Sequence, residues 1–438
     1  MFSCWSNAYF VIYTNTNRMS TKVSQMAETL IGSEIIKLGN EINNQIKEGA
    51  HIFNYTIGDF NPKLFPIPKE FEIGIVEAYA HGQTNYPPAC GILELRKEVS
   101  NFLKIYGNLD YAASQILISG GSRPLIYCIY QTLLDAGDKV VFPIPSWNNN
   151  HYCHLTHARQ AMVYTKPENG FLPTADELKP HLSDAVLLAL CSPLNPTGTA
   201  FGKQQLLDIC DLVVEENKRR GADEKPLYLM YDQMYWMLTS EGVLHYDPVS
   251  LRPDMKKYTL FVDGMSKAFA ATGVRVGWAF GPQSIMDKMA SILGHIGAWA
   301  PRAEQFAAAD FLSQTDAVSD YLDGIRNKVR LRFDRLSEIF NTLKSEGFSI
   351  DIIQPQGAIY ITVQFALKGK RKPDGSLIET TDDIAFYLLK EAQLGVVPFT
   401  AFGNPKGTDW FRVSIGTCDL EELPEMEVLL RNALRKLS

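Results

Sequence analysis

The sequence predicts an α/β fold with a large domain, built on a mostly parallel sheet covered by helices, and a smaller α+β domain that follows it. Three observations predict this fold. Short apolar runs alternate with helical stretches through the middle of the chain, which is the pattern of a parallel sheet. Several of these runs are continuously apolar, as in strands covered on both faces. The last third changes to a long amphipathic helix, two strands and a closing helix.

The chain of 438 residues is long enough for a large core, and its 46% hydrophobic and 21% charged residues are typical of a globular protein. We expect residues 1–23 to be a disordered extension, because Met19 is also a plausible start. Residues 24–55 should form an N-terminal segment, helical over about 24–49, that packs on the small domain. The large domain is expected over 56–310 and the small domain over 311–438.

Strands and helices alternate in the predicted large domain. The run "QILIS" ends at Ser119 and precedes the helical stretch "PLIYCIYQTLLDAG", which closes on a glycine. Further strands are expected at "DKVVFP", "AVLLALCS", "PLYLMYD", "TLFVDG" and "VRVGWAF". A helix fits between them at "GKQQLLDICDLVVEENKRRG", where apolar side chains recur at positions 206, 209, 212 and 213.

The small domain is expected to contain a long helix over "AVSDYLDGIRNKVRLRFDRLSEIFNTLKSEG". Its apolar face consists of Val329, Phe333, Leu336, Phe340 and Leu343. Strands follow at "GAIYITVQF" and "WFRVSIG", separated by the turn-rich surface stretch "KGKRKPDGSLIETTDD". The closing helix covers "DLEELPEMEVLLRNALRKL", where Asp419 and Glu422 have the spacing of a capping box.

Charge and cysteine usage exclude several classes of protein. A net charge of −7 gives no electrostatic reason to expect nucleic acid or an anionic membrane as a partner. No apolar run reaches the ~18 to 20 residues of a membrane-spanning helix. The seven cysteines are scattered without a C-x-x-C pair, which is typical of free thiols in a reducing compartment. Since the start does not read as a signal peptide, we expect a cytoplasmic protein.

Polar side chains follow several of the apolar runs. Asn195 lies in "PLNPTGTAFG" after one run, Asp232 and Tyr235 lie in "DQMYW" after the next, and Lys267 follows the third. A fourth feature, "SGGSRP", opens a helix with backbone N–H groups that can hold a phosphate. Each feature alone is explained as a turn, a cap or a solvated lysine. Because the carboxyl ends of neighbouring strands meet at one edge of a sheet, their recurrence favours one shared site.

The apolar segment "VDGMSKAFAATGVRVGWAFG", residues 262–281, carries two cations, Lys267 and Arg275. Charged side chains are almost never fully buried unless a partner pairs with them. The two cations therefore either reach solvent or face a buried anion.

These motifs together resemble those of a known family. The combination of "NPTG", "D-x-x-Y" and "S-K-x(7)-R-x-G-W", with "YPPACGILELR" at 86–96 and "FRVSIG" at 411–416, is similar to the class I/II aminotransferases. These are pyridoxal 5′-phosphate enzymes with the fold of aspartate aminotransferase, fold type I. The resemblance extends from about Ile52 to the C-terminus and implies a seven-stranded sheet in the large domain.

The resemblance implies that the buried anion is the phosphate of the cofactor. Lys267 resembles the lysine that forms the internal aldimine with the cofactor, and Arg275 resembles the arginine that pairs with its phosphate, a task suited to a guanidinium fork. Asp232 is expected to pair with the pyridinium nitrogen and to keep the ring protonated. Tyr235 and Asn195 are expected to hydrogen-bond the phenolic oxygen of the ring.

Further positions complete the expected cofactor site. Trp147 resembles the aromatic residue stacked on the ring. Backbone amides and side chains of three residues are expected to meet the phosphate, namely Gly121, Ser122 and Arg123. Many relatives carry a serine or threonine three residues before the lysine, where this chain has Gly264, and Ser266 is the candidate substitute.

Other positions imply how the substrate and a second subunit take part. Arg412 resembles the arginine that binds the substrate α-carboxylate, with Asn195 as a further substrate contact. Gly58 resembles the glycine of a mobile segment that closes over the substrate. Tyr86 resembles the tyrosine that reaches the phosphate of the partner subunit, which implies a homodimer with shared active sites.

We therefore expect an aminotransferase that moves an amino group between an L-amino acid and a 2-oxo acid by a ping-pong mechanism, with Lys267 as general base and acid. Lyases, decarboxylases and aminocyclopropane-carboxylate synthases share this site and are the alternative. A DNA-binding regulator is disfavoured, because the short segment before the large domain has no recognition helix.

No metal site is expected. His151, His154 and His157 recur at spacing three, which is more typical of a solvated helix face than of a ligand set. The amino donor is left open. Relatives specific for dicarboxylates often have an arginine in the stretch after the lysine, where this chain offers His295 and Trp299 and where Arg302 comes too late. An aromatic or broad neutral range of donors is therefore expected as much as aspartate.

Overall fold

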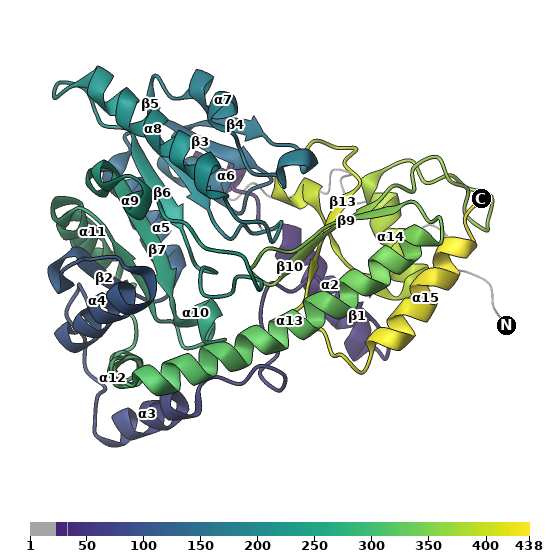
Figure 1. The fold of residues 1–438 in the computed structure, drawn as a ribbon, viewed down its shortest axis with the longest axis horizontal. Helices are drawn as coiled ribbons and strands as arrows, with labels where there is room; N and C mark the ends of the chain where they lie inside the picture. Colours follow the sequence, from purple (N-terminus) through teal and green to yellow (C-terminus); the bar gives the residue numbers. More distant parts are fainter. Residues whose placement is uncertain (1–22, 33) are drawn as a thin grey trace.

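The computed structural model describes residues 23–32 and 34–438, which form two main sheets with helices packed around them (Figure 1). The extension predicted over residues 1–23 lies, except for Val23, outside the described residues. Two helices, α1 (Gln25–Thr29) and α2 (Glu34–Lys47), occupy the stretch where the sequence predicts one. Leu30 already has an extended backbone, so the prediction of a single helix over 24–49 is wrong.

The large sheet has seven strands in the order β2-β8-β7-β6-β5-β3-β4. Their bounds are β2 Ile116–Ser119, β3 Lys139–Ile144, β4 Arg159–Tyr164, β5 Ala185–Cys191, β6 Tyr228–Asp232, β7 Thr259–Gly264 and β8 Gly277–Phe280. Strand β8 runs antiparallel to both neighbours and the other pairs are parallel, which confirms the predicted mostly parallel sheet. The sequence does not reveal β4, because this edge strand exposes most of its side chains and has no continuous apolar run.

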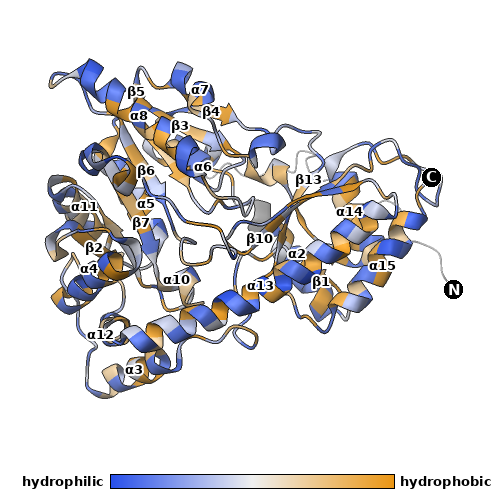
Figure 2. Cartoon of the chain, in the orientation of Figure 1, coloured by the Kyte–Doolittle hydropathy of each residue, from blue (hydrophilic) through white to orange (hydrophobic). Residues whose placement is uncertain are grey.

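Helices cover both faces of this sheet. On one face lie α5 (Ser122–Leu133) and α11 (Gln283–Ile296). On the other face lie α4 (Leu93–Gly107), α8 (Lys203–Arg220) and α12 (Arg302–Ser313). The remaining helices of this part are α3 Lys69–Ala80, α6 Asn149–Thr156, α7 Ala175–Leu178, α9 Pro248–Leu251 and α10 Met265–Ala268. Figure 2 shows hydrophobic strands between helices with hydrophilic outer faces, as the apolar runs predict.

The second sheet has four antiparallel strands in the order β12-β13-β10-β9. Their bounds are β9 Ile350–Ile353, β10 Tyr360–Phe365, β12 Val397–Pro398 and β13 Trp410–Ser414, and a separate parallel pair joins β1 Phe53–Asn54 to β11 Leu394–Gly395. Helices α13 (Thr315–Ser345), α14 (Thr381–Ala392) and α15 (Leu423–Arg435) share its core. All five residues predicted for the apolar face of α13 are buried in this core.

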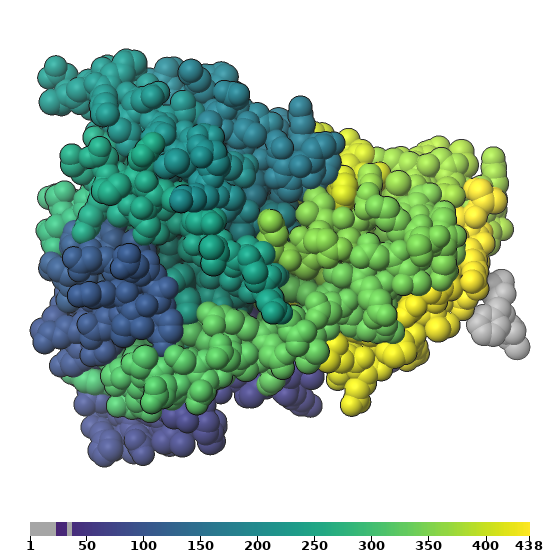
Figure 3. All heavy atoms as spheres, in the orientation of Figure 1, coloured from purple at the N-terminus to yellow at the C-terminus, as the bar shows by residue number. Residues whose placement is uncertain are grey.

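Helix α13 joins the two cores. Val318 and Leu322 near its start belong to the core of the large sheet, whereas its apolar side chains from Ile325 onward belong to that of the second sheet. Figure 1 shows this helix extending from the large part to the second one, and in Figure 3 green atoms continue without a break from one part to the other. Because one helix serves both cores, the division of domains near residue 310 stays a prediction. Over the part of the chain that the structure describes, no helix combines the length and apolar character needed to cross a membrane.

Helix α15 begins later than the predicted capping box requires. Its N-cap is Glu422 without a side-chain cap, and Asp419 Oδ1 instead accepts a hydrogen bond from the backbone nitrogen of Glu421 at 3.1 Å. Pro424 stands in the first turn of the helix, a position that suits proline. The capping box is therefore a wrong prediction, because a turn separates Asp419 from the start of the helix.

Three backbone segments approach one another closely where β7, β8 and α5 meet. Gly264 of β7 lies opposite Gly277 of β8. A Cβ atom on Gly277 would lie 2.6 Å from the carbonyl carbon of Gly121 and 2.8 Å from the nitrogen of Ser122, closer than real Cβ atoms come. The start of α5 therefore rests directly on β8, and the absence of a side chain at position 277 permits this contact.

Replacing Gly277 by alanine should destabilise the protein. The new methyl group meets backbone atoms that cannot rotate away, so we expect a loss of about 1–3 kcal/mol from overpacking. The matched control is Gly324→Ala, in the interior of α13, where nothing lies within 4 Å of the new atom. That exchange should stabilise the helix by roughly 0.5–1 kcal/mol. Thermal unfolding midpoints should move in opposite directions, and an unchanged midpoint for Gly277→Ala would refute the close contact.

Candidate active site

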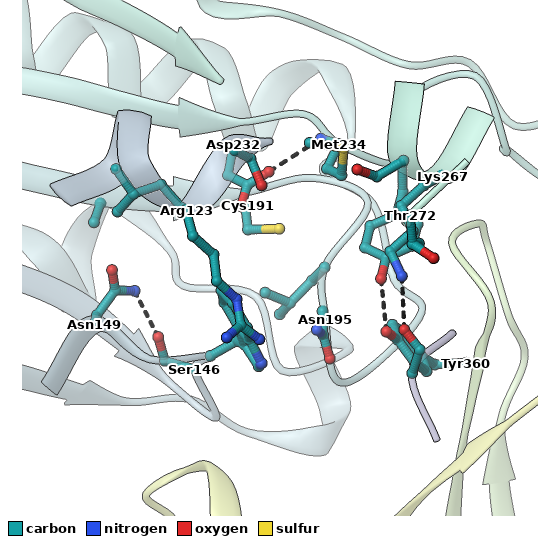
Figure 4. A pocket seen from close by; sticks show the side chains of 18 of the residues that line it. Arg123, Ser146, Asn149, Cys191, Asn195, Asp232, Met234, Lys267, Thr272 and Tyr360 are labelled. Carbon is teal, nitrogen blue, oxygen red and sulfur yellow. Dashed lines mark hydrogen bonds between the residues drawn. The ribbon is translucent and has the colours of Figure 1, made fainter. Parts of the chain in front are cut away.

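A cavity of about 540 Å³ opens at the carboxyl edge of the large sheet, where the second sheet faces it. The site residues predicted from the sequence that line it are Gly58, Ser122, Arg123, Trp147, Asn195, Asp232, Tyr235, Ser266, Lys267, Arg275 and Arg412. Figure 4 shows Lys267, Thr272 and Tyr360 on one side of this cavity and Arg123 and Asn149 on the other. The strand ends thus gather the polar features as the sequence predicts.

Lys267 lies in the short helix α10, directly after β7, and its Nζ donates a hydrogen bond to the carbonyl oxygen of Gly58 at 2.6 Å. Burial lowers the pKa of Lys267 to about 8; the carboxylate of Asp59 opposes this shift, and the guanidinium groups of Arg412, Arg123 and Arg275 reinforce it. A substantial fraction of this amine is therefore neutral near pH 7 to 8. A neutral buried amine can act as a nucleophile or take up a proton.

Asp232 is the last residue of β6, and its Oδ1 accepts a hydrogen bond from the backbone nitrogen of Met234 at 3.0 Å. Burial raises the pKa of Asp232 to about 6, although the hydrogen bond from Met234 lowers it. The carboxyl group is thus mostly ionised at neutral pH, at a desolvation cost that a cationic partner in the cavity would offset.

The start of α5 and Arg275 form a corner suited to an anion. The N-cap of α5 is Gly121, with φ of 90° and no side-chain cap, so the first N–H groups of the helix are open to a ligand. Arg275 has φ of 62°, which is uncommon for a residue with a side chain, and donates from Nη1 to the carbonyl oxygen of Thr272 and from Nη2 to that of Gly120. The absence of a side chain at Gly121 makes room for Arg275, since a Cβ atom there would overlap the guanidinium.

The structure gives a reason for Gly264. A Cβ atom at this position would lie 2.7 Å from the Cα of Gly277 and 2.9 Å from the carbonyl oxygen of Val276. No serine or threonine fits there while β7 and β8 keep this spacing. Ser266, two residues later, lines the cavity and remains the candidate for the missing hydroxyl contact.

Arg412 projects from β13 into the cavity with 2% of its surface exposed. Its Nη1 donates to Oδ1 of Asn195 at 3.1 Å and its Nη2 to the carbonyl oxygen of Thr56 at 2.6 Å. Both acceptors are neutral, so the charge of the guanidinium is not compensated by them. A buried cation in this state favours an anionic ligand.

Arg123 is the third guanidinium of the cavity. It follows Ser122 in the first turn of α5, and its Cζ lies 4.8 Å from the ring centroid of Trp147. This cation–π contact fixes the guanidinium without neutralising it. Its charge remains available to a ligand.

Some predicted residues lie elsewhere. Tyr86 is 81% exposed, stands on the surface 5.2 Å from the ring of Trp299, and does not line the cavity, so its proposed role toward a partner subunit stays a prediction. Neither His295 nor Trp299 lines the cavity of the single chain, and their role in selecting a substrate stays a prediction. His154, expected on a solvated helix face, lies within 2.9 Å of the carbonyl oxygen of Met26.

The cavity also contains residues that the sequence analysis did not assign to it. Asp59 accepts a hydrogen bond at Oδ2 from Oγ1 of Thr272 at 3.0 Å, which ties the segment after β1 to the loop before Arg275. Tyr360, noted in the sequence only within a strand, reaches the interior. Asp59 and Thr272 could have been found from the sequence, because Asp59 directly follows Gly58 and Thr272 lies between Lys267 and Arg275.

Comparison with known proteins relates this geometry to a family. The model of the family described as aminotransferase class I and II matches residues 67–426. An aspartate aminotransferase of Rhizobium meliloti (strain 1021) is 27% identical over 392 residues, which cover 89% of this chain and 90% of the relative. A protein of Rickettsia felis named probable aspartate/prephenate aminotransferase is 28% identical over 378 residues, covering 85% and 88%.

Solved structures give the same result. The crystal structure of the aspartate aminotransferase from Rhizobium meliloti superposes with a TM-score of 0.85 at 26% identity, covering 95% of this chain and all of that chain (100%). The aromatic aminotransferase from Pyrococcus horikoshii OT3 superposes with a TM-score of 0.77 at 25% identity, covering 90% and 98%. The fold-type-I architecture expected from the sequence is thereby confirmed.

Lys267 should behave as a buried amine of lowered basicity. In ligand-free protein, its labelling by an amine-reactive reagent, followed by peptide mapping across a pH series, should have a midpoint near pH 8, well below that of an ordinary lysine. Arg123→Gln removes a cation that lowers the pKa, so its midpoint should rise. Asp59→Asn removes an anion that raises the pKa, so its midpoint should fall. Equal midpoints in all three proteins would contradict this electrostatic account.

Proposed function

The chain belongs to the class I and II aminotransferases, and from this premise we propose that it uses pyridoxal 5′-phosphate, held on Lys267, to move an amino group between an L-amino acid and a 2-oxo acid. One observation carries the proposal. A buried amine of lowered pKa, a buried carboxylate and an anion-binding helix start converge on one cavity, at Lys267, Asp232 and the α5–Arg275 corner. The relatives described above are all named aminotransferases, which does not favour the lyase or decarboxylase alternative.

The residues of the cavity fit this cofactor. Its volume of about 540 Å³ is within the range of small-molecule sites. The open N–H groups of α5 and the guanidinium of Arg275 suit a phosphate, the Asp232 carboxylate suits a protonated ring nitrogen, and Lys267 Nζ suits an aldehyde carbon. When bound, the cofactor supplies an aldehyde that takes up the amino group and a protonated ring that withdraws electrons from the substrate.

The side chains then have distinct tasks. Arg412 binds the substrate α-carboxylate with its guanidinium fork and so orients the Cα–H bond. Lys267, with a pKa of about 8, takes the Cα proton on Nζ and returns a proton later in the same half-reaction. Asp232, ionised above its pKa of about 6, keeps the proton on the ring nitrogen. When a 2-oxo acid accepts the amino group, the same side chains act in the reverse order.

The charges of the cavity favour an acidic amino donor. Three guanidinium groups line it, from Arg123, Arg275 and Arg412. The resemblance predicts a phosphate contact for Arg123, but Arg275 already serves the phosphate and Arg412 the α-carboxylate. Arg123 is then available for a second carboxylate, as in aspartate or glutamate. Two of the relatives above are named aspartate and aspartate/prephenate aminotransferases, which supports this choice.

We also propose that two copies of the chain form a homodimer. The expected role of Tyr86 requires a second active site within its reach, and 81% of its surface is exposed. Helix α3 presents apolar side chains to solvent, with Val76 66% and Ile73 46% exposed, as an interface would require.

The free cysteines among the described residues are consistent with a cytoplasmic location.

Lys267→Ala should abolish the first half-reaction. Mixing the cofactor-loaded protein with an amino acid, in the absence of an acceptor, should change the visible absorbance and release a 2-oxo acid. The rate should fall by at least about 10²- to 10⁴-fold in the variant, because the general base is lost. Borohydride reduction and peptide mapping should place the cofactor on Lys267. Lys288→Ala, at an exposed position on α11, is the control. A fully active Lys267→Ala protein would overturn the assignment.

Arg123→Gln should separate acidic from neutral donors. If Arg123 binds a second carboxylate, kcat/KM for aspartate should fall by roughly 10- to 100-fold, in line with a charge-assisted hydrogen bond, while the value for a neutral aromatic donor changes little. Arg412→Lys is the comparison, because losing the fork at the α-carboxylate should weaken both classes of donor alike. A panel of donors with 2-oxoglutarate measures both effects. An equal loss for both classes in Arg123→Gln would assign Arg123 to the cofactor instead.

A further inference from the structure

Tyr360, the first residue of β10, lines the cavity from the second sheet. It is 1% exposed, and its hydroxyl lies 2.6 Å from the hydroxyl of Tyr235. The two rings meet edge to face, with centroids 5.6 Å apart and an interplanar angle of 72°. This geometry leaves one strong hydrogen bond between the two hydroxyl groups, in which one donates and the other accepts.

Two further segments pack against the side chain of Tyr360. A Cβ atom on Gly58 would lie 2.8 Å from its hydroxyl oxygen, so the absence of a side chain at position 58 makes room for the phenol. The guanidinium of Arg412 lies 4.6 Å from the centroid of its ring. Tyr360 therefore has a defined position between the N-terminal segment, the loop after β6 and strand β13.

The surroundings decide which hydroxyl donates. A cation over a phenol ring draws electron density from its oxygen, which makes the hydroxyl more acidic and a better donor. The cation Arg412 lies over Tyr360, whereas the ring of Tyr235 has Lys267 Nζ at the longer distance of 5.8 Å. Tyr360 is thus the better donor of the pair, and Tyr235 accepts.

A tyrosine that accepts a hydrogen bond keeps its own hydrogen for another partner. Tyr235 lines the cavity, so that hydrogen is available to a ligand there. Accepting one hydrogen bond also strengthens the donation of the next, because the two bonds polarise each other. The two hydroxyl groups therefore form a chain in which Tyr360 donates to Tyr235 and Tyr235 can donate to a ligand in the cavity.

We propose that Tyr360 is a positioning residue that donates to Tyr235 and thereby aims the hydroxyl hydrogen of Tyr235 at a negatively charged oxygen of the bound cofactor. This inference rests on the proposed function, because it requires a cofactor with a phenolic oxygen next to Tyr235. A stronger hydrogen bond from Tyr235 stabilises the unprotonated, negatively charged form of the cofactor. The proton affinity of the cofactor should therefore be lower when Tyr360 is present. Removing the hydroxyl should raise that affinity.

The test is the pH titration of the visible absorbance of the cofactor-loaded protein, in the unchanged chain and in Tyr360→Phe. Phenylalanine keeps the ring beside Arg412 and removes only the donor. The titration midpoint should rise by about half a unit to one unit, the effect of one hydrogen bond. Tyr387→Phe is the matched control, because it removes another buried hydroxyl, bonded to the carbonyl oxygen of Ala433 at 2.6 Å, within the core of the second sheet. Its midpoint should stay unchanged.

A double variant separates positioning from a general structural effect. If Tyr360 acts through Tyr235, adding Tyr360→Phe to Tyr235→Phe should shift the midpoint no further. The same shift in both backgrounds, or no shift in Tyr360→Phe alone, would overturn the inference while leaving the cofactor on Lys267. A chain that forms no coloured complex with pyridoxal 5′-phosphate would overturn the proposed function, and this inference with it.

Discussion

The stacking of Gly264, Gly277 and Gly121 is the contact on which the rest of the site depends. Strand β8 can lie against both β7 and the start of α5 because no side chain stands between them. Lys267 follows Gly264 by three residues, and Arg275 precedes Gly277 by two. The same backbone contact therefore sets where the amine, the guanidinium and the open N–H groups of α5 stand relative to one another. Rigid contacts of this kind provide the preorganisation that electrostatic catalysis requires.

The cavity built on this contact carries an excess of positive charge. Its lining includes three arginines and Lys267, against the carboxylates of Asp59 and Asp232. Arginine keeps its proton in a protein. Burial lowers the pKa of the Lys267 amine into the working range, and the three guanidinium groups reinforce this shift against the carboxylate of Asp59. The same guanidinium groups that would hold phosphate and carboxylate thus also prepare the lysine for proton transfer.

Sequence reasoning succeeded where chain order alone determines proximity. Asn195, Asp232 and Lys267 each lie at or just after the end of a parallel strand of one sheet, so their meeting in the cavity could be predicted without knowing any packing angle. The Tyr235–Tyr360 pair could not, since 125 residues and a change of sheet separate its members. Helix ends were also misjudged, at the break after α1 and the start of α15, because local turns there compete with helix signals of similar strength.

The two sheets are joined by polar contacts that lie inside the cavity itself. Arg412 bonds Asn195 after β5, and Tyr360 bonds Tyr235 after β6, so strands β13 and β10 each meet the large sheet through a residue of the site. A ligand that engages Arg412 must compete with or accommodate the oxygen of Asn195. Its binding free energy therefore depends on how the sheets are placed, and by linkage the placement of the sheets depends on the ligand. The side chains that would hold a substrate are thus also side chains that hold the two sheets together.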